Sequence, residues 1–450
     1  MVAYGGDEVN ALVLDIGTTM TRAGYAGEDT PRVMFPTSFG YIDKEEPIRT
    51  EDVVMAEQGE EAQPPTHQTK RQYYIGDNKI NKFRSNMEVQ NPMKDGMVED
   101  WEAIEHIWDA TFNDMLRVDP ENHPLLCTEA AWNTKEKREK TIELAFEKFQ
   151  FPAFYLAQDA VMTAFSVGRA TALVLDSGGG VTSAVPVYDG FVLRNGIFHQ
   201  PVAGDLLANQ IKKQLYNDLN YTIVPHYRIA KKKQVESDQK SDIQLRELEG
   251  ITDSFNDYQT TRVLNEYKET ICQVSDVTFD EDLDNVNNCW KNSLLSSRSK
   301  RSFEFPDGFN HAFGLERYKV PETLFQPHIN EEPKEENDEN TEEENVGVHE
   351  MVYDSISSCD IDLRPLLFNN VVVTGGNTLF NGFNERLNYE LPLKAPGSKI
   401  KIHATGNATE RKSSSWLGGS ILASLGTFHQ LWISRKEYEE FGASIIHRKC

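Results

Sequence analysis

Cysteine is scarce in this sequence, and long apolar runs are missing from it. The chain of 450 residues holds five cysteines, and no two of them have the CxxC spacing of a zinc or redox site. We therefore expect no disulfide framework and no zinc centre, and a reducing compartment fits best. No apolar run reaches membrane-spanning length, and the N-terminal residues lack the pattern of a signal peptide. These absences predict a soluble intracellular protein that does not engage a membrane.

Positive charge is also in short supply. Lys and Arg number 46 against 71 Asp and Glu, which gives a formal net charge of -25. This deficit argues against a general nucleic-acid surface, which needs an excess of basic side chains. Much of the deficit is concentrated in two segments. Asp43–Glu61 holds eight acidic and two basic residues, and Glu331–Glu344 holds nine acidic residues against Lys334. We expect both segments to be surface loops, and the remainder of the chain is only mildly acidic.

Short apolar runs alternate with helical patterns along most of the chain, which is typical of α/β proteins. Three segments interrupt this alternation, at about 43–72, 229–301 and 330–345. The second contains the basic run KKKQVESDQK and the polar run SLLSSRSKRS, and the third is acidic and of low complexity. We interpret all three as insertions at the surface of a compact fold, and the third as disordered.

The run ALVLD occurs twice, as ALVLDIGTT from Ala11 and as ALVLDSGGG from Ala172. Each copy has the pattern of a buried strand that ends at an acidic residue, Asp15 or Asp176, before a tight turn. Turns of Gly and small hydroxyl residues bring backbone N–H groups onto phosphate oxygens, and Mg²⁺ on those phosphates is held through one or two carboxylates. Either copy alone could be an ordinary β-turn. The repetition favours a duplicated fold whose halves face each other across a nucleotide.

Several longer blocks of the sequence resemble actin. They include DIGTTMTRAGYAGEDTPRVMFPT, LVLDSGGGVTSAVPVYDG, VVVTGGNTLF and WLGGSILASLGTFHQLWISRKEYEEFGASIIHRKC, and the similarity spans nearly the whole chain apart from the three insertions. The pattern is most similar to the nuclear fourth class of actin-related proteins. It implies the actin-like ATPase fold, an α/β fold in which two related, ribonuclease H-like domains enclose a nucleotide cleft. It would place residues 1–166 and 413–450 in the first domain and residues 167–412 in the second.

The resemblance also implies a ligand, ATP with Mg²⁺ or Ca²⁺, and the residues that bind it. Asp15 and Asp176 would hold the cation through water, and Arg22 stands where actin has a phosphate-contacting lysine. Without the resemblance, Lys268 and Glu269 would be taken for a solvated helix face. The residues assigned to nucleotide binding are Asp15, Gly17, Thr18, Thr19, Arg22, Asp176, Gly178, Gly179, Gly180, Gly204, Lys268, Glu269, Gly375, Gly376, Asn377, Leu379 and Lys412.

The departures from actin concern hydrolysis. Asp159 stands where conventional actins have the glutamine that positions the attacking water, and Ser183 replaces a histidine of the same site. Gly179 replaces an acidic residue near the water shell of the metal. Phosphoryl transfer needs a positioned nucleophile beside a metal-neutralised phosphate. We therefore predict ATP binding with slow or absent hydrolysis and no catalytic residue. The alternative is an active ATPase or phosphotransferase of the same fold.

The remaining expectations concern partners. The segment that actin uses to grip its filament neighbour is replaced by acidic residues within 43–72, which predicts that this protein forms no homofilament. The resemblance implies a nuclear subunit of chromatin-remodelling or histone-acetyltransferase complexes. There it would pair with an actin monomer on a long helix of the scaffold, the helicase-SANT-associated helix. The acidic segments could meet histones or could simply be solvated, and the basic runs could contact DNA or form an exposed loop face.

Overall fold

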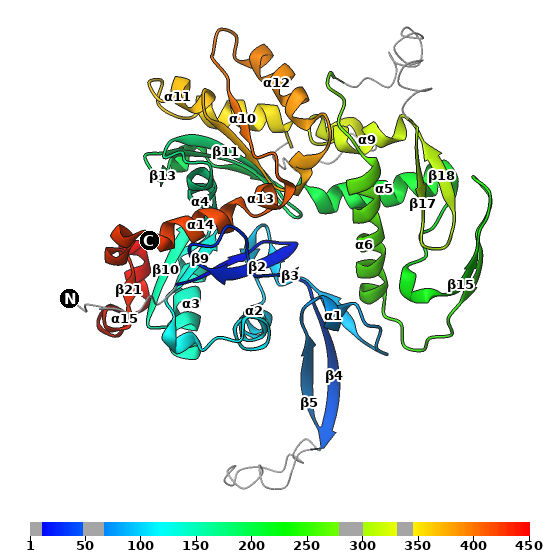
Figure 1. Cartoon of the computed structure of the whole chain (residues 1–450), viewed down its shortest axis with the longest axis horizontal. Helices are drawn as coiled ribbons and strands as arrows, with labels where there is room; N and C mark the ends of the chain where they lie inside the picture. Colours follow the sequence, from blue (N-terminus) through cyan, green and yellow to red (C-terminus); the bar gives the residue numbers. More distant parts are fainter. Residues whose placement is uncertain (1–10, 48–66, 279–299, 331–344) are drawn as a thin grey trace, which may run out of the picture.

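The computed structural model describes residues 11–47, 67–278, 300–330 and 345–450. Two mixed β-sheets lie one above the other, and each has its own covering helices (Figure 1). The strands of the first sheet are β1 (Leu12–Ile16), β2 (Met20–Tyr25), β3 (Val33–Pro36), β9 (Leu125–Glu129), β10 (Ala153–Gln158) and β21 (Ile433–Ser434). Those of the second sheet are β11 (Ala172–Ser177), β12 (Thr182–Tyr188), β13 (Phe191–Val192), β14 (Phe198–Gln200), β19 (Val371–Thr374) and β20 (Ile402–Ala404).

The two sheets share one topology. In the first sheet β1 pairs antiparallel with β2, and β2 with β3, while β9 and β10 continue in parallel on the other side of β1. In the second sheet β11 pairs antiparallel with β12, and β12 with β13, while β19 and β20 continue in parallel on the other side of β11. The duplicated α/β fold expected from the repeated ALVLD is therefore confirmed.

Helices separate the sheets and cover their outer faces (Figure 1). Between the sheets lie α4 (Asp159–Ser166) and α14 (Ser414–Ser424), which pack directly on each other. The first sheet is covered by α2 (Trp101–Asp109), α3 (Lys135–Glu143), α15 (Arg435–Phe441) and α16 (Ile446–Lys449). The second is covered by α10 (Val348–Ser357), α11 (Arg364–Phe368) and α12 (Phe383–Lys394), and α13 (Ala408–Lys412) leads into α14.

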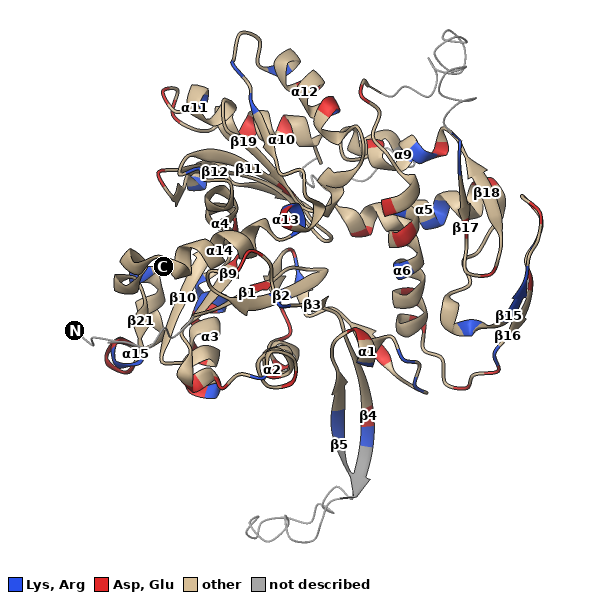
Figure 2. Cartoon of the chain, viewed as in Figure 1, with Lys and Arg blue, Asp and Glu red and all other residues tan. Residues whose placement is uncertain are grey.

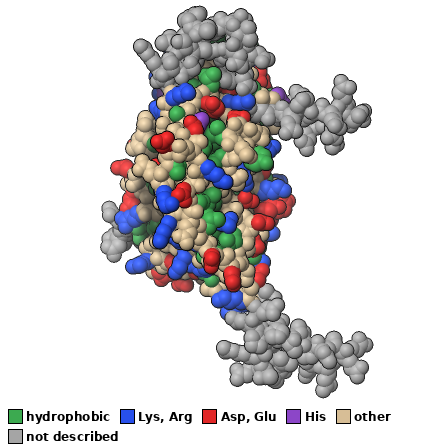
Figure 3. All heavy atoms as spheres, turned by 90° about the vertical axis from the view of Figure 1, so that its right-hand side faces the viewer, with side chains coloured by type: hydrophobic (Ala, Val, Ile, Leu, Met, Phe, Trp, Pro, Cys, Tyr) green, Lys and Arg blue, Asp and Glu red, His purple; other side chains and the backbone are tan. Residues whose placement is uncertain are grey.

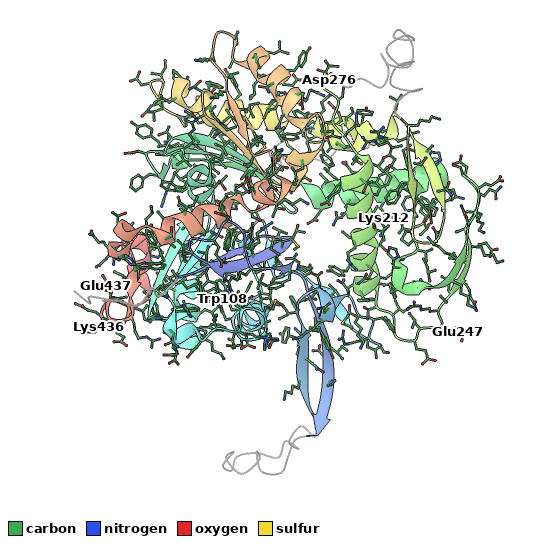
Figure 4. The ribbon with its side chains drawn as sticks, viewed as in Figure 1. Trp108, Lys212, Glu247, Asp276, Lys436 and Glu437 are labelled. Atoms are coloured by element: carbon green, nitrogen blue, oxygen red, sulfur yellow. The ribbon has the colours of Figure 1, made fainter. Side chains whose placement is uncertain are left out.

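Strand alternation places the core on both faces of each sheet. On β1, Leu12 and Leu14 pack in the outer core of the first half, whereas Val13 faces the core between the sheets. Trp108 of α2 lies in the interior of the first half, 1% exposed (Figure 4). Trp416 of α14 is fully buried between the sheets, and its indole Nε1 donates to the carbonyl of Val13 at 3.1 Å.

Smaller elements extend each half. The first half carries α1 (Asp77–Ile80), the β7–β8 hairpin (Met93–Lys94, Met97–Val98) and a small sheet of β4 (Phe39–Pro47), β5 (His67–Tyr74) and β6 (Glu88–Gln90). The second half carries α5 (Gly204–Leu219), α6 (Asp253–Ile271), α9 (Glu316–Glu322), and the hairpins β15–β16 (Ile229–Lys233, Asp242–Leu245) and β17–β18 (Arg301–Glu304, Asn310–Phe313). The β4–β5 hairpin projects away from the body of the molecule (Figure 1).

The expected insertions differ from what the structure shows. Residues 43–47 and 67–72 were expected to be loop, but they form parts of β4 and β5, paired in register from Gly40 with Tyr74 to Pro47 with His67. Residues 253–271 were expected to belong to a surface insertion, but they form α6, eight of whose side chains are buried. That part of the segment is built into the fold. Residues 48–66, 279–299 and 331–344 lie outside the described residues.

The basic run of the second segment lies on β15, where acidic partners surround it. Lys232 Nζ lies 2.7 Å from Glu304 Oε1, and Lys233 Nζ lies 2.7 Å from Asp242 Oδ2. Basic and acidic side chains also alternate over the face that carries α5, α6 and the two hairpins (Figures 2 and 3). This mixture gives no continuous positive surface on the face shown.

The C-terminal residues return to the first sheet through β21, as the resemblance implied, although the exact domain boundaries stay a prediction. The apolar block from Ser414 forms α14, which is buried along most of its length. Its exposed face includes Ile421, and Leu425 and Leu431 beyond it are also exposed. Within the described part of the chain, no helix combines the length and apolarity needed to cross a bilayer.

Candidate functional site

A cavity of about 800 Å³ lies between the two halves. Every residue that the sequence assigned to nucleotide binding lines this cavity, with the exception of Gly180. Gly180 lies immediately behind the lining, since a Cβ built on it would be 2.8 Å from Thr18 Cγ2. The structure therefore brings together residues that are separated by nearly 400 positions of sequence, from Asp15 to Lys412.

The two repeated turns have the same internal geometry. The amide of Gly17 donates to the carbonyl of Met20 at 3.1 Å, and the amide of Gly178 donates to that of Val181 at 3.0 Å. Thr18 and Thr19 form the tip of the first turn, and Gly179 and Gly180 form the tip of the second. The two tips almost touch. A Cβ on Gly179 would lie 1.9 Å from Thr19 Oγ1, so a side chain at this position would displace the opposite turn.

The acidic residues that precede the turns have different surroundings. Asp15 accepts from Arg22 at 3.0 Å and from the hydroxyl of Thr128 at 2.7 Å. Burial and the charge of Asp15 together raise the pKa of Asp176 to about 6, against the opposing effect of Arg22. A divalent cation near both carboxylates would offset this repulsion.

The residues that the structure describes offer no complete metal site by themselves. Among the described residues, no group of three or more His, Cys, Asp or Glu side chains is placed to hold a metal ion. This agrees with the binding mode of Mg²⁺, which keeps several waters and takes one or two carboxylates together with ligand phosphates. Asp15 and Asp176 supply two carboxylates of that kind.

Two residues that depart from actin also line the cavity. Asp159 begins α4, and its Oδ1 accepts from the amide of Ala160 at 2.6 Å. Burial raises the pKa of Asp159 well above its usual range, and the charge of Asp176 adds to this effect. Ser183 lies across the β11–β12 ladder from Asp176 and is 7% exposed. Ionisation of Asp159 is therefore disfavoured relative to an exposed carboxyl group.

The far end of the cavity is built by α6, the turn after β19 and α13. Lys268 is buried, and its Nζ donates to the carbonyl of Gly204 at 2.9 Å. Burial lowers the pKa of Lys268, and Asp205 opposes that shift. Beyond it, Lys412 Nζ lies 2.9 Å from Glu269 Oε1, which joins α13 to α6 across the cavity wall.

The turn after β19 depends on glycine. Gly375 has φ of 92°, and a Cβ on it would lie 2.3 Å from the carbonyl oxygen of Ser177. This close approach brings Asn377 to the second repeated turn, where its Nδ2 donates to the carbonyl of Gly178 at 2.7 Å. The turn at Gly375 and Gly376 is therefore packed against the second copy of the repeat.

The sequence analysis missed several residues of the cavity wall, among them Asn265, Ser413 and Ser415. Asn265 Oδ1 and the hydroxyl oxygens of both serines are buried and have no hydrogen-bond partner in the part of the chain that the structure describes. Nothing in their local sequence marks them, because they follow no motif spacing. Buried polar atoms without partners fit a wall completed by a polar ligand.

An aromatic contact crosses between the halves at the rim of the cavity. The ring of Trp132, which follows β9, stacks on His199 of β14, with centroids 4.4 Å apart and planes at 6°. Asp95 of the β7–β8 turn joins them, since its Oδ1 lies 3.2 Å from His199 Nδ1 and its carbonyl accepts from Trp132 Nε1 at 3.0 Å. These residues close one side of the cavity beside Gly96 and Val181.

The two small-residue turns, the paired carboxylates and the unpartnered polar atoms together fit a phosphorylated ligand carrying a divalent cation. Comparison with known proteins gives an independent view. The family model described as actin matches residues 6–450. The chain is 39% identical to "Actin-related protein 4" of Yarrowia lipolytica, over 99% of this chain and 97% of that protein. It is 38% identical to "Actin-related protein 4" of Oryza sativa subsp. indica (99% and 100%) and 35% identical to that of Mycosarcoma maydis (99% and 99%).

Proposed function

Because this chain belongs to the actin family, and within it to the actin-related protein 4 type, we propose that it binds ATP as a structural ligand. We propose further that it serves as a non-filamentous nuclear subunit of chromatin-remodelling or histone-acetyltransferase complexes, with possible histone contacts through its acidic segments. The observation that carries the ATP part is the pair of repeated turns, which face each other across one cavity with Asp15 and Asp176 at their bases.

The residues of the cavity divide between the parts of such a ligand. The turns at Gly17–Thr19 and Gly178–Gly180 would present backbone amides to phosphate oxygens. Asp15 and Asp176 would hold Mg²⁺ or Ca²⁺ through water, and the cation would neutralise phosphate charge. The side of the cavity formed by Lys268, Glu269 and Lys412 would hold the base and the sugar.

The surroundings of Asp159 support binding without rapid hydrolysis. Asp159 Oδ1 already accepts from the amide of Ala160, so it is less free to orient a water molecule than a glutamine side chain would be, and Ser183 is too short to take the place of a larger imidazole. These two departures from actin do not alter the repeated turns or the paired aspartates, Asp15 and Asp176. We therefore propose that the protein binds ATP with slow or absent hydrolysis.

The proposed partners are an actin monomer and an amphipathic scaffold helix. Ile421, Leu425 and Leu431 follow one another along α14 and the turn after it, and they are 40%, 46% and 45% exposed. An amphipathic helix docks by laying its apolar face on exposed apolar side chains of its partner. This surface supports the proposal that the C-terminal region docks on such a helix.

The ATP proposal is tested by identifying the nucleotide that the protein carries. The full-length protein is denatured at isolation and again after prolonged incubation with Mg²⁺, and the released nucleotide is separated by chromatography. We expect ATP in both samples. In Gly179→Val the new side chain meets Thr19, so we expect the nucleotide to be lost, whereas Gly406→Val enters open space and should retain it.

The other outcomes discriminate between the functions. Conversion of the bound ATP to ADP during incubation would favour the active ATPase. Absence of any nucleotide from the wild-type protein, or equal retention in both glycine variants, would contradict the proposal.

A further inference from the structure

The two halves of the molecule also meet at the free end of α6, away from α14 (Figure 1). A separate hydrophobic cluster forms there, distinct from the cores of the two sheets. We call the part of it that crosses between the halves the clasp. Its members are Ile80, Phe83, Met87 and Val89 from the first half, and Tyr227, Phe255 and Tyr258 from the second.

Phe255 lies at the centre of the clasp and is 1% exposed. Its ring meets Phe83 of the first half edge-to-face at 5.8 Å between centroids, and Tyr227 of its own half at 4.9 Å. Phe83 also stacks on Tyr227 at 5.9 Å. Separating the halves here would expose these rings, so opening costs free energy in proportion to the apolar area uncovered.

Hydrogen bonds reinforce the apolar contact on one short stretch of chain. From the first half, the amide of Asn86 donates to Gly250 O at 2.7 Å, and the amide of Val89 donates to Ser254 Oγ at 2.9 Å. The hydroxyl of Thr252 caps the N-terminus of α6 and also donates to the carbonyl of Met87. The start of α6 is thus attached to residues 86–89 through its backbone, its cap and its side chains.

Both sides of the clasp lead directly to the cavity. From Phe255 to Lys268, α6 spans about 20 Å, and its second half forms the cavity wall. On the other side, Asn91 follows β6 and its Nδ2 donates to the carbonyl of Thr18 in the first repeated turn at 2.7 Å. Lys212 of α5 points toward α6, where its Nζ lies 3.0 Å from Asp257 Oδ1 (Figure 4). The clasp therefore joins the two walls of the cavity.

We infer that the clasp holds these walls closed and makes a bound nucleotide slow to exchange, an inference that rests on the proposed ATP binding. A nucleotide enclosed between the halves leaves when its two walls move apart. Because α6 and β6 reach from the clasp to the cavity, that movement requires the contacts around Phe255 to break. The rate of release is then set by the opening of the clasp as well as by contacts to the nucleotide itself.

The test compares Phe255→Ala with Phe313→Ala in the full-length protein. Both phenylalanines are buried in the second half, but Phe313 packs within that half alone. Release of bound nucleotide is followed by chasing with excess 2′/3′-O-(N-methylanthraniloyl)-ATP. We expect release to be at least about tenfold faster in Phe255→Ala than in Phe313→Ala, which corresponds to about 1.4 kcal/mol in the opening barrier. Equal release rates would overturn the inference.

Two further measurements complement this test, because a cross-link needs no alanine variant and hydrogen exchange needs no nucleotide. Gln259 Nε2 donates to Asn81 Oδ1 across the clasp at 3.3 Å, so the thiols of Asn81→Cys with Gln259→Cys can be joined by a short bifunctional maleimide, and this cross-link should slow nucleotide release. Each single cysteine variant is the control. Hydrogen exchange at the amides of Asn86 and Val89 should accelerate in Phe255→Ala only, and unchanged exchange would count against the clasp. If the wild-type protein carries no nucleotide, ATP binding fails while hydrogen exchange still decides whether the clasp exists.

Discussion

At the scale of single residues, the two copies of ALVLD differ at the position that faces their aspartate. Asp15 lies opposite Arg22 in the β1–β2 ladder, whereas Asp176 lies opposite Ser183 in the β11–β12 ladder. Asp15 therefore has a cationic partner of its own, whereas the partly buried Asp176 has none opposite it, and desolvation together with the charge of Asp15 raises the pKa of Asp176 to about 6. The asymmetry leaves Asp176 as the carboxylate with most to gain from a bound cation.

His349 provides a test of buried titratable groups away from the cavity. It is 7% exposed at the start of α10, stacks on Phe325 at 6.0 Å, and its Nδ1 has no hydrogen-bond partner in the described part of the chain. Burial lowers its pKa in the folded protein, against the charges of Glu390 and Glu350. As the pH falls below about 6.5, the unfolded chain takes up a proton that the folded protein resists, so stability is lost.

We therefore expect His349→Gln to make the free energy of unfolding less dependent on pH between about 7.5 and 5.5. The difference in slope from wild type is limited to about 1.4 kcal/mol per pH unit, because one proton is involved. Urea unfolding of both proteins at several pH values measures it. The exposed His429 serves as the control, and His429→Gln should keep the wild-type slope. Parallel slopes for His349→Gln and wild type would contradict the prediction.

At the scale of elements, strands could be predicted from the sequence where a run of apolar residues recurs along the chain. The apolar runs of β1 and β11 and the small residues after them were identified correctly, because buried strands and tight turns need those residue types. The sequence analysis assigned the segment of α6 to an insertion because most of its residues are polar. Its buried residues lie along one side of the helix only. The strands β4 and β5 carry charged residues and few large apolar ones, so only their mutual pairing reveals them.

The crossing of α4 and α14 gives a prediction at this scale. Gly418 of α14 lies so close to α4 that a Cβ would be 1.7 Å from the carbonyl oxygen of Met162. We expect Gly418→Ala to force the helices apart and to lower the free energy of unfolding by about 1–3 kcal/mol, the usual cost of overpacking a core. Gly426→Ala is the matched control, because nothing lies within 4 Å of its added carbon. Denaturant unfolding of both variants measures the effect, and equal stabilities would show that the helices can separate without cost.

At the scale of the whole molecule, the cavity is made from segments that no local pattern connects. The repeated turns could be predicted because their chemistry lies within a few residues. The wall residues Asn265 and Ser413, and the contacts of Trp132 with His199, depend on how the two halves approach each other. That approach is set by packing across the cleft, at α14 and at the clasp, and it cannot be predicted from a single segment.

Self-association depends on the charge and shape of the whole molecule. Two causes could prevent it: repulsion by a net charge of -25, or the shape of the β4–β5 hairpin where a filament contact would form. The described part of the hairpin is not strongly acidic, since Asp43 pairs with Arg71 at 2.8 Å and Lys44 and Lys70 are exposed beside them. Because the charges of the described strands are balanced, we predict that shape contributes more than charge to preventing self-association. We expect sedimentation velocity to show a monomer at roughly 0.1 M and at roughly 1 M salt, although the Debye length falls from about 10 Å to about 3 Å. Assembly that appears only at high salt would identify charge as the cause, and pelleting at both would contradict a non-filamentous protein.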